Sequence, residues 1–253
     1  MNWKLFLGTT FHRTQHAALS SRLFPLTRYF PRGRSWLYDA QRFAGTKDFR
    51  VIFDVGANDG ETAYGLVRYF PKTRIYCFEP VASTMELLKR NYGHYPNVQC
   101  VPLALGSRPD EVSIPLHVNS GMNTMSASPD RGDLTGKTTR IKVVTADSFC
   151  SESGVESVDI WKMDVQGWEM EALKGAGSLF DNNRVHFVFS EVGFKRSDTD
   201  MQHFADLNDY LEERGFWLCG FYDFFRYGEQ KERLGFCNAL YINPDFKGIP
   251  LSR

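Results

Sequence analysis

A short apolar run that ends in a turn of small and acidic residues constrains the fold of this chain most. Residues 51–61 read V-I-F-D-V-G-A-N-D-G-E. A run of this length is typical of a strand buried on both faces of a parallel sheet, and glycines after it let the backbone approach a ligand. In such a sheet the first turn from strand to helix forms the floor of the ligand site. The stretch predicts either a tight structural turn or, as we favour, an α/β fold with a small-molecule site at Gly56, Ala57, Asn58 and Gly60.

The spacing of this turn argues against a phosphate ligand. It reads G-x-N-x-G rather than the G-x-G-x-x-G of dinucleotide sites, and Asp59 and Glu61 stand where a phosphate would be repelled. Asn58 is the side chain that best tolerates left-handed backbone angles. A ligand that carries an ammonium group and no phosphate fits these residues better.

Beyond this run, short apolar segments alternate with helical patterns, which favours β-α-β units and a mainly parallel sheet. The sequence predicts strands at 51–55, 74–78, 98–104, 158–163 and 185–189, and an edge hairpin of antiparallel strands at 216–221 and 239–242.

Helices are expected between these strands, where apolar residues recur at helical spacing. Pro71 ends the first helix, and Gly93 is expected to close the second in the left-handed conformation. A further helix is predicted at 168–174, stopped by Gly175 and Gly177. Ser197 and Asp200 have capping-box spacing before a helix that Gly215 closes.

Residues 112–144 break this regular order. Alternating apolar and polar residues at 112–118 and 140–144 predict a two-stranded excursion, with a long loop at 119–136 between the strands. Loops of that length within compact domains are usually functional or disordered. The S-G-M-N-T-M run at 120–125 is therefore a candidate lid over the substrate, with disorder as the alternative.

Glu79 ends the second strand, 25 positions after Asp54. A carboxylate at that strand end is placed to accept both hydroxyls of a ribose, as an acid does in nucleotide-binding folds. Pro80 then begins the next helix at its first position. Considered alone, Glu79 is equally well explained as a solvated surface acid. Because it occurs together with the glycine turn, we favour the role at the ribose.

Charge divides the chain into a basic arm at 1–49 and a main domain at 50–253. The first 50 residues hold nine Lys/Arg and two acids, although the whole 253-residue chain has no net charge. Aromatic and aliphatic residues interleave with arginines there, so an amphipathic segment that meets anionic lipid or an acidic substrate is one option. We favour a helix packed on the domain with its arginines in water, and an organelle transit peptide is a third option.

The five cysteines are widely spaced and include no C-x-x-C pair, which argues against a disulfide framework and a zinc ribbon. We expect reduced core thiols in a cytoplasmic protein. Uninterrupted apolar stretches fall far short of the roughly 18 residues that span a bilayer, so a soluble chain is expected.

Four motifs occur in a fixed order along the main domain. They are D-V-G-A-N-D-G at 54–60, F-E-P at 78–80, A-L-G at 104–106 and K-M-D-V-Q-G-W-E at 162–169. Together they resemble the FkbM-type methyltransferases, within the class I enzymes that use S-adenosylmethionine. The resemblance runs from about residue 50 to about residue 225 and leaves the basic arm and the C-terminal tail outside it.

This resemblance implies a Rossmann-like class I methyltransferase fold, with a seven-stranded, mainly parallel sheet, one antiparallel strand and helices on both faces. It also implies bound S-adenosylmethionine and methylation of a hydroxyl oxygen on a sugar, glycan or natural product. The residues expected to bind the cofactor are Asp54 and Gly56–Gly60 at the methionine part, Glu79 and Pro80 at the ribose, Ala104 and Leu105 beside adenine, and Asp164. Gln166 and Trp168 depart from the family pattern, which often has Glu and a small residue there, and this leaves the substrate open.

Asp164 and Glu191 are the main catalytic candidates. The donor of a methyl transfer is already activated, so the protein has to position the acceptor and remove its proton. Asp164 ends one strand and Glu191 lies just past the next; if the two are neighbours, their backbones are about 5 Å apart. The carboxylates then serve as general base, or they hold Mg²⁺, which we rank second because two carboxylates make an incomplete metal site.

Three other residues have weaker claims. Lys162 would orient a carboxylate or an acceptor oxygen, unless it extends to the surface. His117 and His186 are single histidines on apolar strands, which are more often hydrogen-bonded core residues than catalysts. Asp164 itself has a structural alternative, as the cap of a helix that begins near Gly167.

Two other function classes compete with methyl transfer. An NAD(P)-dependent oxidoreductase is disfavoured by the spacing of the glycine turn and by the absence of a Tyr-x-x-x-Lys pair. A non-catalytic S-adenosylmethionine-binding protein is the other. Nucleic acid is disfavoured as a partner because the main domain is acidic and lacks an N-P-P-Y-type motif. The sequence indicates neither an oligomeric state nor whether the arm contacts a membrane.

Overall fold

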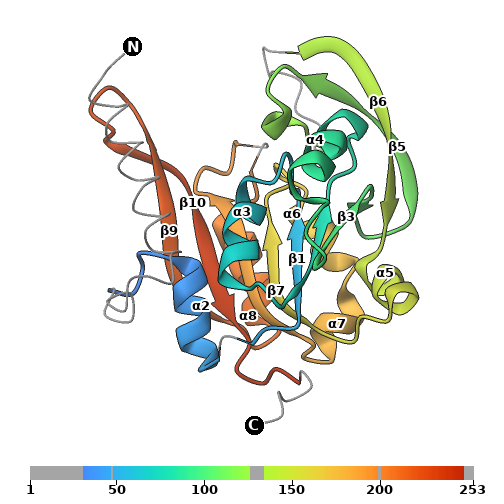
Figure 1. The fold of residues 1–253 in the computed structure, drawn as a ribbon. Coiled ribbons are helices and arrows are strands. Elements are labelled where there is room, and N and C mark those ends of the chain that lie inside the picture. The colour runs from blue at the N-terminus through green and yellow to red at the C-terminus, as the bar shows by residue number, and fades with distance from the viewer. Residues whose placement is uncertain (1–30, 47, 126–133, 199–200, 248–253) are drawn as a thin grey trace.

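The computed structural model describes residues 31–46, 48–125, 134–198 and 201–247. A seven-stranded sheet with the order β3-β2-β1-β7-β8-β10-β9 forms its centre. All neighbours are parallel except that β10 runs antiparallel to β8 and β9. The predicted mainly parallel sheet with one antiparallel strand is confirmed (Figure 1). Its strands are β1 (Val51–Val55), β2 (Arg74–Phe78), β3 (Val98–Val101), β7 (Val158–Met163), β8 (Val185–Gly193), β9 (Trp217–Tyr227) and β10 (Arg233–Ile242).

Helices cover both faces of this sheet, each through its apolar side. One face packs against α2 (Trp36–Ala44), α3 (Glu61–Tyr69) and α4 (Ala82–Tyr92). The other packs against α5 (Ala146–Ser153), α6 (Glu169–Lys174), α7 (Gly177–Asp181) and α8 (Phe204–Glu212). Strand β7 is buried along its whole length, as expected for a central strand covered on both faces.

Helix α2 joins the described end of the N-terminal arm to the core. Its Trp36 stacks on Phe189 of β8, with ring centroids 4.0 Å apart. The hydroxyl of Tyr222 donates to Asp39 Oδ2 over 2.9 Å, which ties the helix to β9. The aromatic and arginine residues of the proposed amphipathic segment lie mainly in 1–30, outside the described residues.

A smaller three-stranded sheet, with the order β4-β6-β5, rises from the main sheet. It consists of β4 (Ala104–Leu105), β5 (Asp110–His117) and β6 (Leu134–Val144), and the short helix η2 (Ser120–Met122) follows β5. The predicted strand 98–104 was wrong in extent: Pro102 lacks an N–H, and the chain turns there so that β4 pairs with β6. The predicted loop 119–136 is shorter than expected, and its residues 126–133 are not described.

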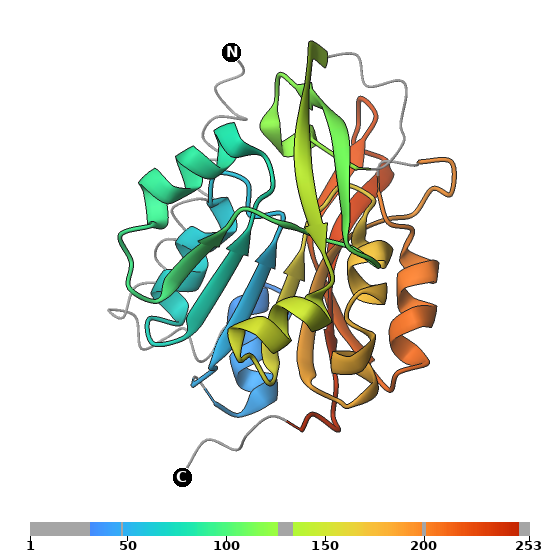
Figure 2. The same cartoon turned by 90° about the vertical axis from the view of Figure 1, so that its right-hand side faces the viewer.

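Two β ribbons extend past the carboxyl edge of the main sheet (Figures 1 and 2). The β5–β6 ribbon lies towards the β2 side of the sheet, and the β9–β10 hairpin lies at its opposite edge. The predicted edge hairpin is confirmed, although both of its strands are longer than expected.

Three predicted helix ends differ from the structure. Gly175 caps α6 as expected, but Gly177 begins α7 instead of helping to stop α6. Gly93 closes α4 in the right-handed conformation, at φ −63°, because its N–H continues the helix by donating to Lys89 O. Helix α8 is capped by His203, whose Nδ1 accepts from the N–H of Ala205, instead of by Ser197. Asp200 lies outside the described residues.

None of the helices in the described part of the chain combines the length and apolar character that crossing a bilayer requires. All five cysteines are described and none forms a disulfide. Cys77, Cys150 and Cys237 are buried, as expected of core thiols, while Cys100 and Cys219 are half-buried.

Candidate functional site

The glycine turn lies where the sequence predicts it, between β1 and α3. Gly56, Asn58 and Gly60 all have left-handed φ angles, of 75°, 48° and 99°. The N–H groups of Gly56 and Ala57 both donate to the carbonyl of Phe78 at the end of β2. A Cβ at position 56 would overlap the backbone carbonyl of Asp164, so only glycine fits between the two loops.

Gly60 has a different reason to be glycine. A Cβ there would overlap the ring of Tyr92 on α4, and the residue does not line the pocket described below. Ala57 is likewise buried in the core that packs against α3. Gly60 and Ala57, both predicted to bind the cofactor, therefore pack towards α4 and α3 and do not line the pocket.

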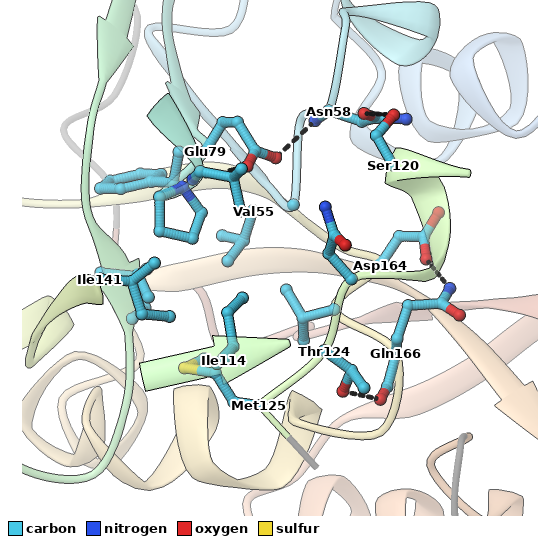
Figure 3. Close-up of a pocket in the computed structure, with 18 of the residues that line it drawn as sticks. Val55, Asn58, Glu79, Ile114, Ser120, Thr124, Met125, Ile141, Asp164 and Gln166 are labelled. Atoms are coloured by element: carbon cyan, nitrogen blue, oxygen red, sulfur yellow. Dashed lines mark hydrogen bonds between the residues drawn. The ribbon is translucent and has the colours of Figure 1, made fainter. Parts of the chain in front are cut away.

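Glu79 lies in the pocket that the turn partly encloses. Its Oε2 accepts from the N–H of Asn58 at 3.1 Å, and its Oε1 accepts from the N–H of Val81 at 2.9 Å (Figure 3). Burial raises the pKa of this carboxyl from its ordinary value to about 7, against the lowering effect of the two hydrogen bonds. Glu79 is thus held rigidly, with carboxylate lone pairs left for further donors.

Asp54 and Lys162 form a buried ion pair beneath the turn. Lys162 Nζ lies 2.9 Å from Asp54 Oδ1 and donates to the carbonyl of Gly56 over 3.1 Å. Neither residue lines the pocket, and Lys162 is only 6% exposed, so it does not extend to the surface. Asp54 Oδ2 has no hydrogen-bond partner in the part of the chain described.

The wall of the pocket opposite Asp164 is mainly apolar. Pro80, Ala104 and Leu105 line the pocket, as the motifs imply, and further side chains of the smaller sheet line it as well (Figure 3). The latter, which sequence reasoning missed, are Ile114 and Ile141, with Met125 next to them.

Asp164 and Glu191 lie at the carboxyl ends of neighbouring strands, as predicted. Met163 of β7 is in register with Ser190 of β8, so the two acids follow paired residues. Glu191 lies within β8, not past it, because β8 pairs with β10 as far as Gly193. Asp164 does not cap α6, whose first residue is Glu169 and whose N-cap is Trp168.

Gln166 joins the two acids. Its Nε2 donates to Asp164 Oδ1 at 2.8 Å and to Glu191 Oε2 at 3.5 Å. Sequence reasoning noted this residue only as a departure from the family pattern, and the link was not foreseen.

The segment at 119–125 covers the pocket and is fastened at two points. Ser120 Oγ donates to Asn58 Oδ1 at 2.9 Å, and Thr124 Oγ1 donates to the carbonyl of Gln166 at 2.6 Å (Figure 3). Five residues of the predicted lid run 120–125 line the pocket, and a role as a lid stays a prediction; Asn119–Met125 is called the closing segment below.

Glu169 is, after Glu79, a second buried carboxyl near the site whose pKa is raised, and it was not singled out from the sequence. It is 1% exposed, and its Oε1 accepts from the N–H of Val165 at 3.0 Å. Burial raises its pKa to about 7. Its Oε2 has no partner among the described residues.

Neither of the two strand histidines reaches the pocket. His117 is buried in β5, and His186 stacks on Phe246, with centroids 4.5 Å apart. Burial lowers the pKa of His186 to about 4. Within the described ranges, no group of three or more His, Cys, Asp or Glu side chains is placed to hold a metal ion.

Comparison with known proteins agrees with this architecture. The methyltransferase FkbM domain matches residues 54–218. The chain is 28% identical over 159 residues to the 2-O-methyltransferase NoeI of Sinorhizobium fredii, across 56% of this chain and 62% of that protein. It is 29% identical over 147 residues to the hexuronic acid methyltransferase AglP of Haloferax volcanii, across 56% of this chain and 55% of that protein.

A solved structure shares the fold. The methyltransferase FkbM of Methylobacillus flagellatus matches with a TM-score of 0.50 at 18% identity, across 88% of this chain and 47% of that one. In all three comparisons the match spans less than two thirds of the other protein.

The sheet order, with its single antiparallel strand, is that of the Rossmann-like class I methyltransferase fold. The chain belongs to the FkbM methyltransferase family, whose domain covers most of the main domain from Asp54 to Leu218. The predicted family and fold are confirmed.

Proposed function

We propose that this chain transfers a methyl group from S-adenosylmethionine to a hydroxyl oxygen on a sugar, glycan or natural product. The observation that carries the proposal is one pocket at the carboxyl edge of the sheet, which brings together the glycine turn, Glu79 and Asp164. Family membership supports the same activity, and so do the two curated relatives, one a 2-O-methyltransferase and the other a hexuronic acid methyltransferase.

The chemistry of the pocket fits S-adenosylmethionine. Glu79 has lone pairs for the ribose hydroxyls, while Ala104, Leu105 and Ile141 offer an apolar wall for adenine. Asp54, expected at the methionine part, lies beneath the turn in its ion pair with Lys162 and supports the turn without lining the pocket. When bound, the cofactor supplies an electrophilic methyl group on a sulfonium.

Positioning the acceptor and removing its proton are assigned to the carboxyl pair, Asp164 and Glu191. Asp164 lines the pocket and Glu191 is joined to it through Gln166. A carboxylate in this position accepts the hydroxyl proton as the acceptor oxygen gains its methyl group, so no alkoxide has to form in advance. Lys162 is better placed to hold Asp54 and the turn than to contact an acceptor, because it does not line the pocket.

A general base remains our first choice over Mg²⁺ for activating the acceptor. Asp164 and Glu191 are bridged by an amide, and an amide nitrogen is not a ligand for a hard cation. EDTA is therefore expected to leave methyl transfer unchanged, and a loss of activity that added Mg²⁺ restores would contradict the choice.

Titration calorimetry of the purified protein with S-adenosylmethionine, S-adenosylhomocysteine and NADH tests the cofactor. Binding of the first two and not of NADH is expected, and binding of NADH alone would favour the oxidoreductase. Methyl transfer from labelled cofactor to a panel of glycans then separates an enzyme from a protein that only binds the cofactor. Asp164→Asn is expected to abolish transfer, and unchanged transfer in that variant would contradict the assigned role.

A further inference from the structure

Gln166 donates a hydrogen bond to each of the two candidate acids. Its amide nitrogen carries two protons, and it spans from Asp164 Oδ1 to Glu191 Oε2, at 2.8 and 3.5 Å. Two ionised carboxylates at adjacent strand ends repel each other. A shared neutral donor offsets that repulsion and fixes which oxygen of each acid is engaged.

The backbone of Gln166 makes a separate connection. Its φ of 54° is left-handed, a conformation that non-glycine residues seldom adopt and that is often retained at functional sites. In this conformation its carbonyl accepts a hydrogen bond from the hydroxyl of Thr124 at 2.6 Å, while its side chain donates to Asp164 (Figure 3) and also to Glu191. One residue thus touches the carboxyl pair and the closing segment Asn119–Met125.

We propose that Gln166 is a positioning residue, which holds Asp164 and Glu191 as one acceptor-activating pair and links that pair to the segment closing the cofactor pocket. This inference rests on the proposed function. Gln166 takes no proton itself. It orients the carboxylate oxygen that receives the proton of the acceptor. Because its amide is neutral, it adds no third charge beside the two carboxylates.

A metal-binding test examines the placement of Gln166 without any turnover. Gln166→Glu puts a third carboxylate between two others and creates the oxygen cluster that a divalent cation prefers. Titration with Mn²⁺ alone, followed by calorimetry or electron paramagnetic resonance, is expected to show binding at least tenfold tighter than in the wild type. Gln99→Glu on β3, an exposed position, is the matched control. No gain over that control would overturn the inference.

A kinetic test separates positioning from a purely structural role. Gln166→Asn retains a residue that tolerates the left-handed backbone but is one methylene too short to bridge both acids, and Gln166→Leu removes the donor. Both variants are expected to lower kcat for a glycan acceptor at least tenfold, while their affinity for S-adenosylhomocysteine stays within threefold of wild type. An equal loss of both quantities would show that Gln166 only maintains the pocket, and an unchanged kcat would also refute the inference.

Two further results keep this inference separate from the proposed function. Thr124→Val removes the hydroxyl that fastens the closing segment to Gln166 and is expected to weaken S-adenosylhomocysteine binding severalfold. Unchanged binding would refute the link to the closing segment. If the wild type binds no S-adenosylmethionine, the proposed function fails, while the Mn²⁺ titration still decides whether Gln166 bridges the acids.

Discussion

Glu169 provides a sharp test of the electrostatics in this site. The carboxyl is 1% exposed and faces the N–H of Val165, and its second oxygen has no partner in the described chain. Glu169→Gln keeps the size of the side chain and the acceptor for Val165, and it removes the ionisable group. Any pH dependence of stability that vanishes in this variant therefore belongs to Glu169.

The expected magnitude follows from the pKa. Burial raises the pKa of Glu169 from an unfolded value near 4.5 to about 7. Between these values the folded protein holds a proton that the unfolded chain has lost, so the free energy of unfolding decreases as the pH rises. The full effect is about 3 kcal/mol, of which about 2.5 kcal/mol falls between pH 5 and pH 8.

Urea denaturation of both proteins at pH 5 and pH 8 measures this effect. The wild type is expected to lose about 2.5 kcal/mol more than Glu169→Gln over that interval. Glu79, whose pKa is raised in the same direction, contributes equally to both proteins and cancels in the difference. Glu86→Gln, at an exposed glutamate on α4, is expected to behave as the wild type.

Parallel losses of stability in the wild type and in Glu169→Gln would refute the reasoning. They would mean that the buried carboxyl titrates near its ordinary pKa, through water or a partner that reaches its second oxygen. A larger loss in the variant would indicate that the ionised form is the stabilising one.

Three other predictions follow from the pocket and its supports. Lys162→Met is expected to cost about 3–5 kcal/mol in urea unfolding because it leaves Asp54 charged and unpaired, and a further Asp54→Leu change should recover part of it. Gly60→Ala is expected to destabilise the protein by overlap with Tyr92; Tyr92→Ala should relieve part of that loss, and strict additivity would argue against the contact. Glu79→Gln is expected to weaken S-adenosylmethionine binding. In the wild type, calorimetry should show affinity falling roughly tenfold from pH 8 to pH 6 as Glu79 takes up a proton, and the variant should not show this fall. If the fall persists in the variant, another group causes it.

Local patterns were enough to predict a mainly parallel sheet and the glycine turn, whereas the seven strands with one antiparallel member were implied by the family resemblance. The buried run at 51–55 and the alternation after it reflect backbone and burial rules that operate within a few residues. The positions of Glu79 and Asp164 followed because each ends a strand of a parallel sheet, and such ends meet at one edge. The strand predicted at 98–104 ends at Val101 in the structure. Pro102 follows and has no N–H to donate to a neighbouring strand, so the strand stops there although the residues around it are apolar.

The connections within the site could not be predicted in this way. Thr124 and Gln166 are 42 residues apart, and Gln166 and Glu191 are 25 apart. Whether such residues meet depends on how the smaller sheet and β8 are placed. Lys162 shows the same limit, since its type and strand position suggest either catalysis or a surface role, and only the fold places it under the turn beside Asp54.

The close approach of Gly56 to the carbonyl of Asp164 has an evolutionary consequence. The turn after β1 and the loop after β7 meet there with no room between them for even a methyl group. Any larger side chain at Gly56 would push these two segments apart, so the shape of the pocket is more readily altered in the β5–β6 ribbon, whose Ile114 and Ile141 line it, than at this contact.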